Sequence, residues 1–219
     1  MHRNKNISAP VIKRLPRYYR FLGELRDKGV IRISSRELSD KMGFTASQIR
    51  QDLNCFGGFG QQGYGYPVES LYNEIGHILG LDHTYNAILI GAGNLGKAVA
   101  MHMSFEKRGF RLTAIFDNDP GKVGTVIRDI SVSDLDSLEQ FCLENKTDAA
   151  IFCVPKEAAH EIADRLYRAG VKNFWNFSHY DLSVHYDDII VENVHLNDSL
   201  MILCYKISDA NYFPDDTSA

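Results

Sequence analysis

The sequence lacks the long apolar segments that mark membrane and exported proteins. Its 219 residues contain no run of about 18 apolar side chains, the length that crosses a bilayer as a helix. The opening residues, MHRNKNISAP, lack the apolar core of a signal peptide. The sequence therefore predicts a cytoplasmic protein with no membrane partner.

Cysteine is scarce, and the other metal ligands show no pattern. The four cysteines, Cys55, Cys142, Cys153 and Cys204, are far apart and form no C-x-x-C pair. This usage indicates reduced, buried thiols in a reducing compartment. The eight histidines show no H-E-x-x-H or comparable spacing. We therefore expect no metal.

Positive charge is missing from most of the chain. The formal net charge is −4, but residues 1–66 hold 12 lysines and arginines against 5 acids, a charge of +7. Residues 67–219 hold 12 basic side chains against 23 acids, a charge of −11. Basic charge confined to one segment suggests a polyanion partner for that segment alone.

Short capped helices are expected in the basic segment. A first helix opens near Ser8 and Pro10 and has its main body over residues 17–28, with Pro16 expected to kink or restart it. A capping box of Ser34 and Glu37 opens a second helix over residues 36–41. Residue Thr45 caps a third, over residues 46–56. Two short helices joined by a tight turn are typical of the helix-turn-helix.

The third helix has two unlike faces at 100° per residue. Apolar side chains gather on one side, and the other carries Ser47, Arg50, Gln51 and Asn54. Arginine can hydrogen-bond guanine, and glutamine or asparagine can bond adenine, so this face suits the major groove of DNA. Arg50 and Gln51 are the expected base readers. An ordinary solvated face is the alternative.

A glycine- and aromatic-rich stretch, residues 57–66, follows the third helix. It suits a β-hairpin wing with Gln61 near the tip, and the alternative is a low-complexity linker. A further helix over residues 67–81 then connects two domains, with the boundary near residue 82.

A dinucleotide fingerprint begins at Gly91. The apolar strand expected over residues 87–90 leads into G-x-G-x-x-G, formed by Gly91, Ala92, Gly93, Asn94, Leu95 and Gly96, and a helix follows. The glycines would allow the tight turn, the approach of a pyrophosphate and close packing of the helix. Asp117 ends the next strand, where an acid can bind both hydroxyls of an adenosine ribose and repel a 2′-phosphate. The stretch therefore favours NAD(H).

Alternating strands and helices continue to the end of the second half. They predict a Rossmann-like, doubly wound parallel sheet, with Ser133 capping a helix over residues 134–145. Ligands of such sheets lie at the carboxyl ends of the strands. That rule places the following residues near the nicotinamide: Val154, Pro155, Asn176, Phe177 and Ser178.

A last helix, expected over residues 198–207, has a wide apolar face after the sheet is complete. The face suits burial on another subunit, or equally on its own domain.

Several stretches together resemble one family. They are residues 13–22 (KRLPRYYRFL), 35–38 (SREL), 48–53 (QIRQDL), 56–66 (FGGFGQQGYGY), 77–81 (HILGL), 91–96 (GAGNLG) and 191–194 (VENV). The chain resembles the bacterial redox-sensing transcriptional repressors of the Rex family. The resemblance covers nearly the whole chain.

The resemblance implies three parts. Residues 1–82 would form a winged-helix DNA-binding domain with its connecting helix, residues 83–196 an NAD(H)-binding Rossmann domain, and residues 197–219 a dimerisation helix that swaps between subunits, with its tail. The homodimer would bind inverted-repeat operators in double-stranded DNA and be released by NADH. Arg14, on the first helix, joins the expected DNA contacts.

Two positions depart from the family pattern and bear on the switch. Members often carry a tyrosine and an acid where this chain has His102 and His195. The acid can pair with an arginine that maps to Arg20, and histidine cannot form that pair when neutral. Leu196 of a second subunit would complete the nicotinamide pocket.

Two other functions remain open from the residues. One is an NAD-dependent oxidoreductase with a basic N-terminal domain, for which His179 is the best general base, although no Tyr-x-x-x-Lys pair exists. The other is a sensor of CoA or another nucleotide on the same fold. We expect a DNA-binding NADH sensor rather than an enzyme.

Overall fold

The computed structural model describes residues 7–55 and 64–212. The chain divides into two compact units, Met1–His83 and Thr84–Ala219. The predicted wing residue Gln61 lies outside the described residues.

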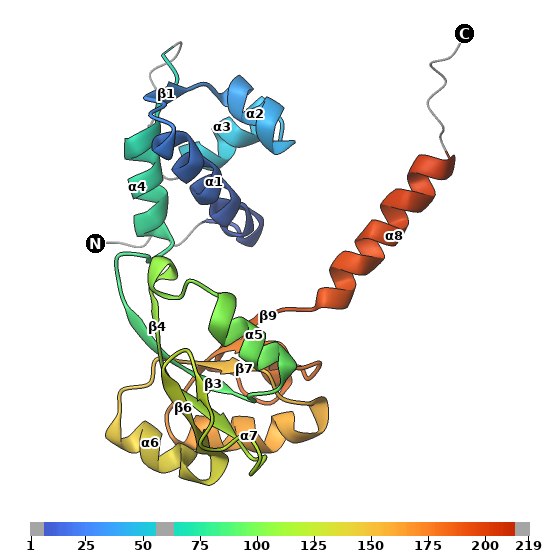
Figure 1. The fold of residues 1–219 in the computed structure, drawn as a ribbon. Coiled ribbons are helices and arrows are strands. Elements are labelled where there is room, and N and C mark those ends of the chain that lie inside the picture. The colour runs from blue at the N-terminus through green and yellow to red at the C-terminus, as the bar shows by residue number, and fades with distance from the viewer. Residues whose placement is uncertain (1–6, 56–63, 213–219) are drawn as a thin grey trace. The chain divides into compact units, whose positions relative to one another are not determined.

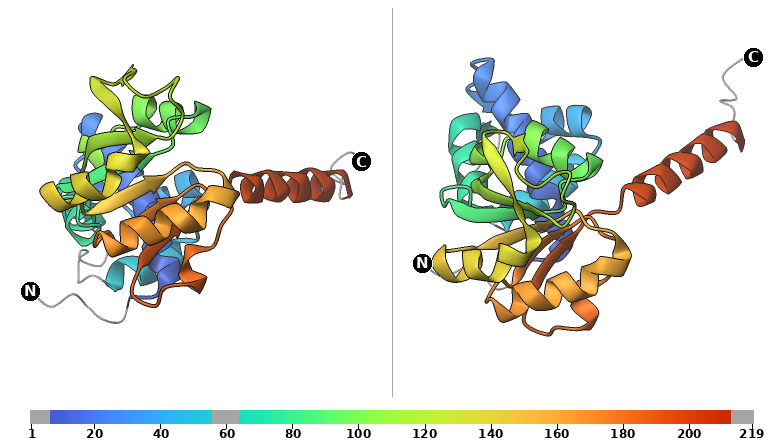
Figure 2. Two further views of the ribbon diagram at one scale, coloured as in Figure 1. Left: turned by 90° about the horizontal axis from the view of Figure 1, so that it is seen from below. Right: turned by 60° about the horizontal axis from the view of Figure 1, so that its bottom comes forward.

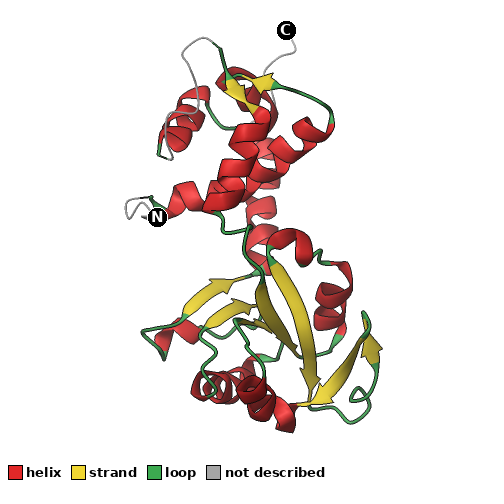
Figure 3. Cartoon of the chain, turned by 90° about the vertical axis from the view of Figure 1, so that its left-hand side faces the viewer, coloured by secondary structure: helices red, strands yellow, loops and turns green. Residues whose placement is uncertain are grey.

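The first unit is a small helical domain with a two-stranded sheet (Figures 1 and 3). Its elements are α1 (Ala9–Asp27), β1 (Arg32–Ile33), α2 (Ser35–Met42), α3 (Ala46–Asn54), β2 (Tyr66–Pro67) and α4 (Val68–Ile78). Strands β1 and β2 pair antiparallel. The core is built by buried side chains from every helix, among them Leu15, Leu22, Leu38, Leu53 and Leu71.

The ends of the two short helices follow their sequence. The Ser34 hydroxyl accepts a hydrogen bond from the Glu37 amide at 3.1 Å, and the Glu37 carboxylate accepts one from the Ser34 amide at 2.7 Å. Gly43 ends α2 in the left-handed region, at φ 67°. The Thr45 hydroxyl accepts from the Gln48 amide at 3.1 Å and starts α3. The predicted capping box and helix-turn-helix spacing are confirmed.

Helix α1 does not restart at Pro16, which was one of the two outcomes expected there. It runs unbroken for 19 residues with Pro16 inside it. Proline removes one backbone donor from a helix. The side chains on both sides of it, from Val11 to Leu22, bury one continuous stripe in the core, and this packing offsets the missing hydrogen bond.

The second unit is a seven-stranded sheet with helices on both faces (Figures 1 and 2). Its elements are β3 (Tyr85–Ile90), α5 (Asn94–His102), η1 (Glu106–Arg108), β4 (Phe110–Asp117), β5 (Val126–Ile127), β6 (Ile130–Asp134), η2 (Leu135–Ser137), α6 (Leu138–Glu144), β7 (Ala149–Phe152), α7 (Lys156–Arg168), β8 (Asn173–Asn176), η3 (Leu182–Val184), β9 (Ile190–Asn193) and α8 (Leu196–Tyr212). The strand order is β5-β6-β4-β3-β7-β8-β9.

The sheet is parallel from β6 to β9, as the alternating pattern predicts. Ile88 and Ile90 of β3 belong to the core under α6 and α7, whereas Ala87 and Leu89 belong to the core under α5. This alternation is the sign of a strand buried on both faces. Order reverses between β3 and β7, where a ligand crevice is expected at the carboxyl ends.

The region after β4 corrects the sequence prediction. Strand β5 pairs antiparallel with β6 as an edge hairpin, and its turn residues Arg128 and Asp129 have φ of 49° and 63°. Ser133 does not cap a helix, because it lies within β6 and pairs with Phe116 of β4. Asp134 takes that role, accepting a hydrogen bond from the Asp136 amide at 2.9 Å.

The last helix, α8, begins earlier than predicted and extends away from the sheet (Figure 1). Every side chain from Leu196 to Asp209 is exposed, including Leu200, Leu203 and Ile207. In the described part of the chain, no helix is both long and apolar enough to span a bilayer.

Candidate nucleotide and nucleic-acid sites

The glycine-rich loop joins β3 to α5 at the carboxyl end of the sheet. Gly91 has φ of 95°, and a Cβ there would lie 2.5 Å from the carbonyl oxygen of Cys153. A Cβ on Gly96 would lie 1.8 Å from the carbonyl oxygen of Gly91. Both positions therefore require glycine, one for the turn and one for the close packing of α5 on the strand.

The open side of this loop fits a pyrophosphate. A Cβ on Gly93 would meet no atom within 4 Å. Gly93 is also the N-cap of α5, and no described side chain caps this helix. The first-turn amides, which include those of Asn94 and Leu95, belong to the positive end of the helix dipole, where anions bind.

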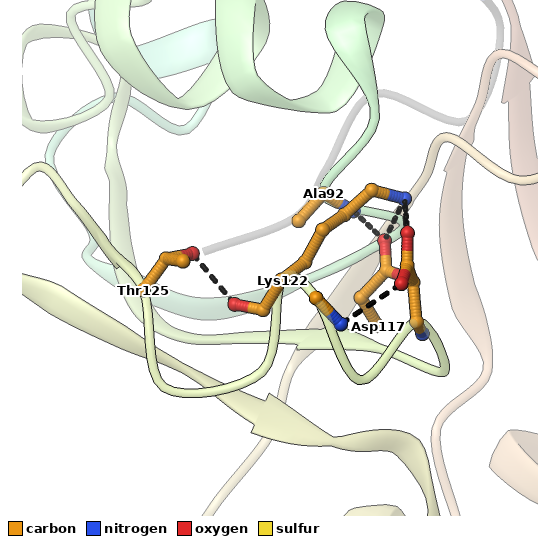
Figure 4. Close-up of polar contacts among 6 residues, drawn as sticks. Ala92, Asp117, Lys122 and Thr125 are labelled. Atoms are coloured by element: carbon orange, nitrogen blue, oxygen red, sulfur yellow. Dashed lines mark hydrogen bonds and ion pairs between the residues drawn. The ribbon is translucent and has the colours of Figure 1, made fainter.

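Asp117 lies at the end of β4 and is only 6% exposed. Its carboxylate accepts hydrogen bonds from the Ala92 amide at 2.7 Å and from the Asp119 amide at 2.9 Å (Figure 4). It thus fastens the glycine-rich loop to the end of the neighbouring strand.

Sequence reasoning missed the lysine that joins this acid. Lys122 Nζ lies 3.3 Å from Asp117 (Figure 4). It also lies 3.3 Å from the more exposed Asp119. Burial lowers the pKa of Lys122, but its hydrogen bonds with Asp119 and Asp117 outweigh burial and hold it above the ordinary value. The spacing of an acid, a turn and a lysine five residues later was the available signal.

Asn176 and Ser178, predicted near the nicotinamide, are buried and bonded to their surroundings. The Asn176 amide donates to the Tyr180 carbonyl and to Asn193, both at 2.8 Å. Its side-chain oxygen accepts from the Ser178 amide at 3.0 Å and from the Ser178 hydroxyl at 2.7 Å. These contacts tie β8 to β9 and to the loop that follows β8.

Apolar side chains end the two neighbouring strands. Val154 and Pro155 follow β7, and Phe177 follows β8, with its ring 4.7 Å from that of Trp175. Val154 is buried beside the glycine-rich loop, since its side chain lies 3.3 Å from a Cβ built on Gly91.

The histidines predicted to take part in a switch are exposed. His102 is the last residue of α5, and His195 follows β9. The His195 ring stacks on that of His179, with centroids 6.0 Å apart and planes at 12°. Arg20 is exposed on α1, in the other unit.

The polar face of α3 is free of the core. Ser47, Arg50, Gln51 and Asn54 are all exposed, while Ile49 and Leu53 are buried. The Arg50 guanidinium donates to the Ser35 hydroxyl at 3.2 Å, at the start of α2.

Arg14 points into the unit. Its guanidinium lies 2.7 Å from both carboxylate oxygens of Asp52, a buried acid on α3 that sequence reasoning did not single out. Its signal was an acid placed beside Leu53, on the inward side of the third helix.

An apolar cavity of about 420 Å³ lies on the face of the second unit that carries α5. Its lining includes Phe105, Phe110, Ile151, Trp175 and Glu192. Helix α5 covers one part of this face, and the part over β7 and β8 is left to the cavity.

The described residues offer neither a metal site nor a disulfide. They contain no group of three or more His, Cys, Asp or Glu side chains that could hold an ion, and the four cysteines are free. Burial raises the pKa of the Cys153 thiol to about 12, so this thiol is not a reactive one.

Comparisons with known proteins agree with the division of the chain into a first and a second unit. Residues 6–54 match a family described as "Putative DNA-binding protein N-terminus", and residues 82–180 match the "CoA binding domain" family. The chain is 58% identical to the redox-sensing transcriptional repressor Rex of Thermoanaerobacter pseudethanolicus, over 97% of this chain and 95% of that protein. It is 56% identical to Rex of Clostridioides difficile, over 94% of this chain and 98% of that protein.

The chain belongs to the Rex family of redox-sensing transcriptional repressors.

Solved Rex-family structures share the fold. A crystal structure of RSP in complex with NAD⁺ and operator DNA has a TM-score of 0.87 and 57% identity, covering 98% of this chain and 100% of that chain. RSP in complex with NADH has a TM-score of 0.86 and 56% identity, covering 94% and 97%. These Rex relatives are repressors and not enzymes, so the oxidoreductase interpretation is dropped.

Proposed function

We propose that this protein is a cytoplasmic transcriptional repressor that binds operator DNA with its first unit and NAD(H) with its second. The observation that carries the proposal is the joining, in one Rex-family chain, of a helix-turn-helix with a free polar face to a glycine-rich loop shaped for pyrophosphate. NADH binding releases the DNA, and NAD⁺ binding is compatible with it.

The pyrophosphate of the nucleotide binds at the start of α5. Gly93 leaves room for it, and the amides of the first turn supply hydrogen bonds. The nicotinamide ring then reaches the ends of β7 and β8, where Val154, Pro155 and Phe177 are the contacts. A neutral ring enters such an apolar pocket at little cost, whereas the cationic ring of NAD⁺ has to be desolvated or paired. The pocket therefore distinguishes NADH from NAD⁺.

Selectivity for NAD(H) over NADP(H) comes from Asp117 and its neighbours. Asp117 and Asp119 together outweigh the single charge of Lys122, so the group as a whole is negative. A 2′-phosphate placed there is repelled. The ribose hydroxyls bind at the end of β4, where Asp117 lies.

The exposed face of α3 enters the major groove. Arg50 and Gln51 read base edges, and Ser47 and Asn54 contact the backbone or neighbouring bases. Gln61 is a further proposed DNA contact. Two copies of α3 related by a two-fold axis need half-sites about one helical turn, or a near multiple, apart, and this matches an inverted repeat.

The homodimer forms through α8. Its exposed residues Leu196, Leu200, Leu203 and Ile207 recur at spacings of four, three and four, which is one stripe of a helix. The second unit of a second copy offers an apolar cavity of about 420 Å³. The stripe of one copy covers this cavity of the other, and Leu196 of the second copy joins the nicotinamide pocket.

The switch connects the pocket to the DNA-binding units through this exchanged helix. His195 lies at the base of α8, and His102 lies at the end of α5. Both histidines, together with Arg20, are the side chains proposed to take part in the switch.

The direct test is a DNA-shift assay on palindromic DNA selected by the protein from a random pool. DNA retained with NAD⁺ and lost with NADH supports the proposal. Equal retention with both nucleotides would remove redox sensing.

A second candidate ligand is CoA, because residues 82–180 match the CoA binding domain family. Competitive titration separates the two. Displacement of bound NADH by CoA at a comparable concentration would favour the CoA interpretation, and the negative group at Asp117 argues against it because CoA carries a phosphate on its ribose.

A further inference from the structure

A charged cluster lies beneath the recognition face of the first unit. Asp52 of α3 is 0% exposed, and its carboxylate accepts four hydrogen bonds. Arg14 donates two at 2.7 Å, Tyr18 donates one from its hydroxyl at 2.9 Å, and Gln48 donates one from its amide at 2.9 Å. The acid is therefore fully satisfied, although it is buried.

The geometry of the pair fixes an orientation as well as a distance. A guanidinium that meets a carboxylate through two parallel hydrogen bonds must share its plane. Arg14 and Tyr18 stand one turn apart on α1, so two points of one helix hold a single carboxylate of the other. This arrangement restricts rotation of α3 about its own axis.

Rotation matters for this helix because it is short. Helix α3 has 9 residues and buries only Ile49, Asp52 and Leu53. Arg50 and Gln51 immediately precede Asp52 and stand about 200° and 100° away from it around the helix. A turn of α3 that loosens Asp52 would therefore sweep both base-reading side chains across the groove.

A contribution to the stability of the first unit does not by itself explain why this charged cluster is buried there. A buried ion pair often stabilises no more than apolar side chains of similar volume, and the neighbouring core residues, Leu15, Leu22, Ile49 and Leu53, are already apolar. Burial raises the pKa of the Asp52 carboxyl, but the hydrogen bonds from Arg14, Gln48 and Tyr18 outweigh it and keep that pKa below its ordinary value. Asp52 and Arg14 therefore both stay charged, and the pair fixes the orientation of α3.

We propose that Arg14 is a positioning residue for base recognition, which acts through Asp52 to fix the rotation of α3 about its own axis. Arg14 makes no phosphate contact that contributes to DNA affinity. The proposal rests on the proposed DNA reading by α3. Arg14 is 23% exposed on its side chain, and its Nε and one Nη are committed to Asp52.

The test uses the full-length protein and Arg14→Lys, which keeps the positive charge and loses the two-pronged contact. Binding to selected operator DNA and to a scrambled duplex is measured by fluorescence anisotropy over a series of salt concentrations. A positioning role predicts that the operator-to-scrambled ratio falls about ten-fold. Binding to the scrambled duplex and its salt dependence stay as in the wild type.

A phosphate contact predicts a different pattern, which Arg14→Met exposes. Loss of one phosphate contact weakens operator and scrambled DNA by the same factor and reduces the slope of log K against log salt by about 0.9. That result with Arg14→Met, together with wild-type discrimination by Arg14→Lys, would overturn the proposal. Arg36→Lys, on the exposed side of α2, is the matched control for the exchange itself.

Two further variants keep the test decisive if Arg14→Lys unfolds the unit. Tyr18→Phe keeps the ring and removes one hydrogen bond to Asp52, so the ratio should fall by a smaller factor. Asp52→Asn should lower the ratio as Arg14→Lys does, and the double variant should lose no more than either single one. Additive losses would contradict a joint role.

The outcomes separate this inference from the proposed function. A wild-type protein that fails to distinguish operator from scrambled DNA removes the proposed DNA reading itself. A wild-type protein that discriminates, with unchanged discrimination in Arg14→Lys, Tyr18→Phe and Asp52→Asn, removes only the positioning role. NADH titration of each variant reports on the second unit and should match the wild type.

Discussion

Arg50 is the side chain on which the proposed base recognition depends most directly. It is exposed on α3, and its guanidinium donates a hydrogen bond to the Ser35 hydroxyl at 3.2 Å. Arg50→Ala should weaken operator binding by about 1–3 kcal/mol and relax sequence preference at one position of each half-site. A DNA-shift series on operators changed one base pair at a time measures both effects. Equal weakening on random and specific DNA would instead make Arg50 a phosphate contact.

Nucleotide selectivity is best tested at Asp119, because Asp117 also fastens the glycine-rich loop. Asp117→Ala should narrow the preference for NADH over NADPH mainly by weakening NADH, since the Ala92 amide loses its partner. Asp119→Asn leaves that hydrogen bond in place and removes one negative charge beside Lys122. NADPH should then bind more tightly while NADH changes little, as measured by intrinsic fluorescence titration. Glu144→Gln, an exposed acid on α6, is the control.

The Asp52 carboxyl gives the first unit an acid-sensitive contribution to stability. Its pKa in the folded protein lies below the ordinary value of about 3.9. The stabilisation is therefore complete above that value and is lost as pH falls through the folded pKa. The free energy of unfolding should fall less steeply between about pH 4 and 2 in Asp52→Asn than in the wild type. Parallel pH profiles by urea unfolding would contradict the assignment.

Residue-level prediction worked where the chemistry is local. The Ser34–Glu37 box, the cap at Thr45 and the glycines at positions 91 and 96 depend on neighbours in the chain, and the structure has each of them as the pattern predicts. Asp52 was missed because its partner Arg14 lies on α1, far away in the sequence. Lys122 was missed because its role depends on the turn that brings it back to Asp117 at the end of β4.

Element boundaries show the same limit. The alternation of strands and helices gave the parallel order, but the position of Ser133 within β6 and the passage of α1 through Pro16 are decided by packing. Neither a strand partner nor a buried stripe on both sides of a proline can be read from a local signal alone.

The proposed role of helix α8 in dimer formation can be tested by deletion. Deleting residues from Asn197 onward removes nearly all of its apolar stripe and should give monomers that bind operator DNA weakly. Sedimentation analysis measures the association state, and circular dichroism shows whether the sheet of the truncated chain is still folded. A stable dimer after the deletion would rule out exchange of this helix.

In the whole molecule, the proposed redox switch depends on coupling between the nucleotide site and the DNA site. A ligand shifts a two-state equilibrium only through its different affinities for the two states. Moving a population from 1:99 to 99:1 requires about 5.5 kcal/mol, which the two nicotinamide sites of a dimer can share. In the proposed switch, a neutral ring in the pocket of Val154, Pro155 and Phe177 would supply that difference, and the exchanged α8 would carry it between subunits.

The coupling must act equally in both directions, because it is a free energy between two binding events. The most direct measurement is a titration of NADH in the presence and absence of saturating operator DNA. Operator DNA is expected to weaken NADH binding by the same factor by which NADH weakens operator binding. An NADH affinity that operator DNA leaves unchanged would contradict the redox switch.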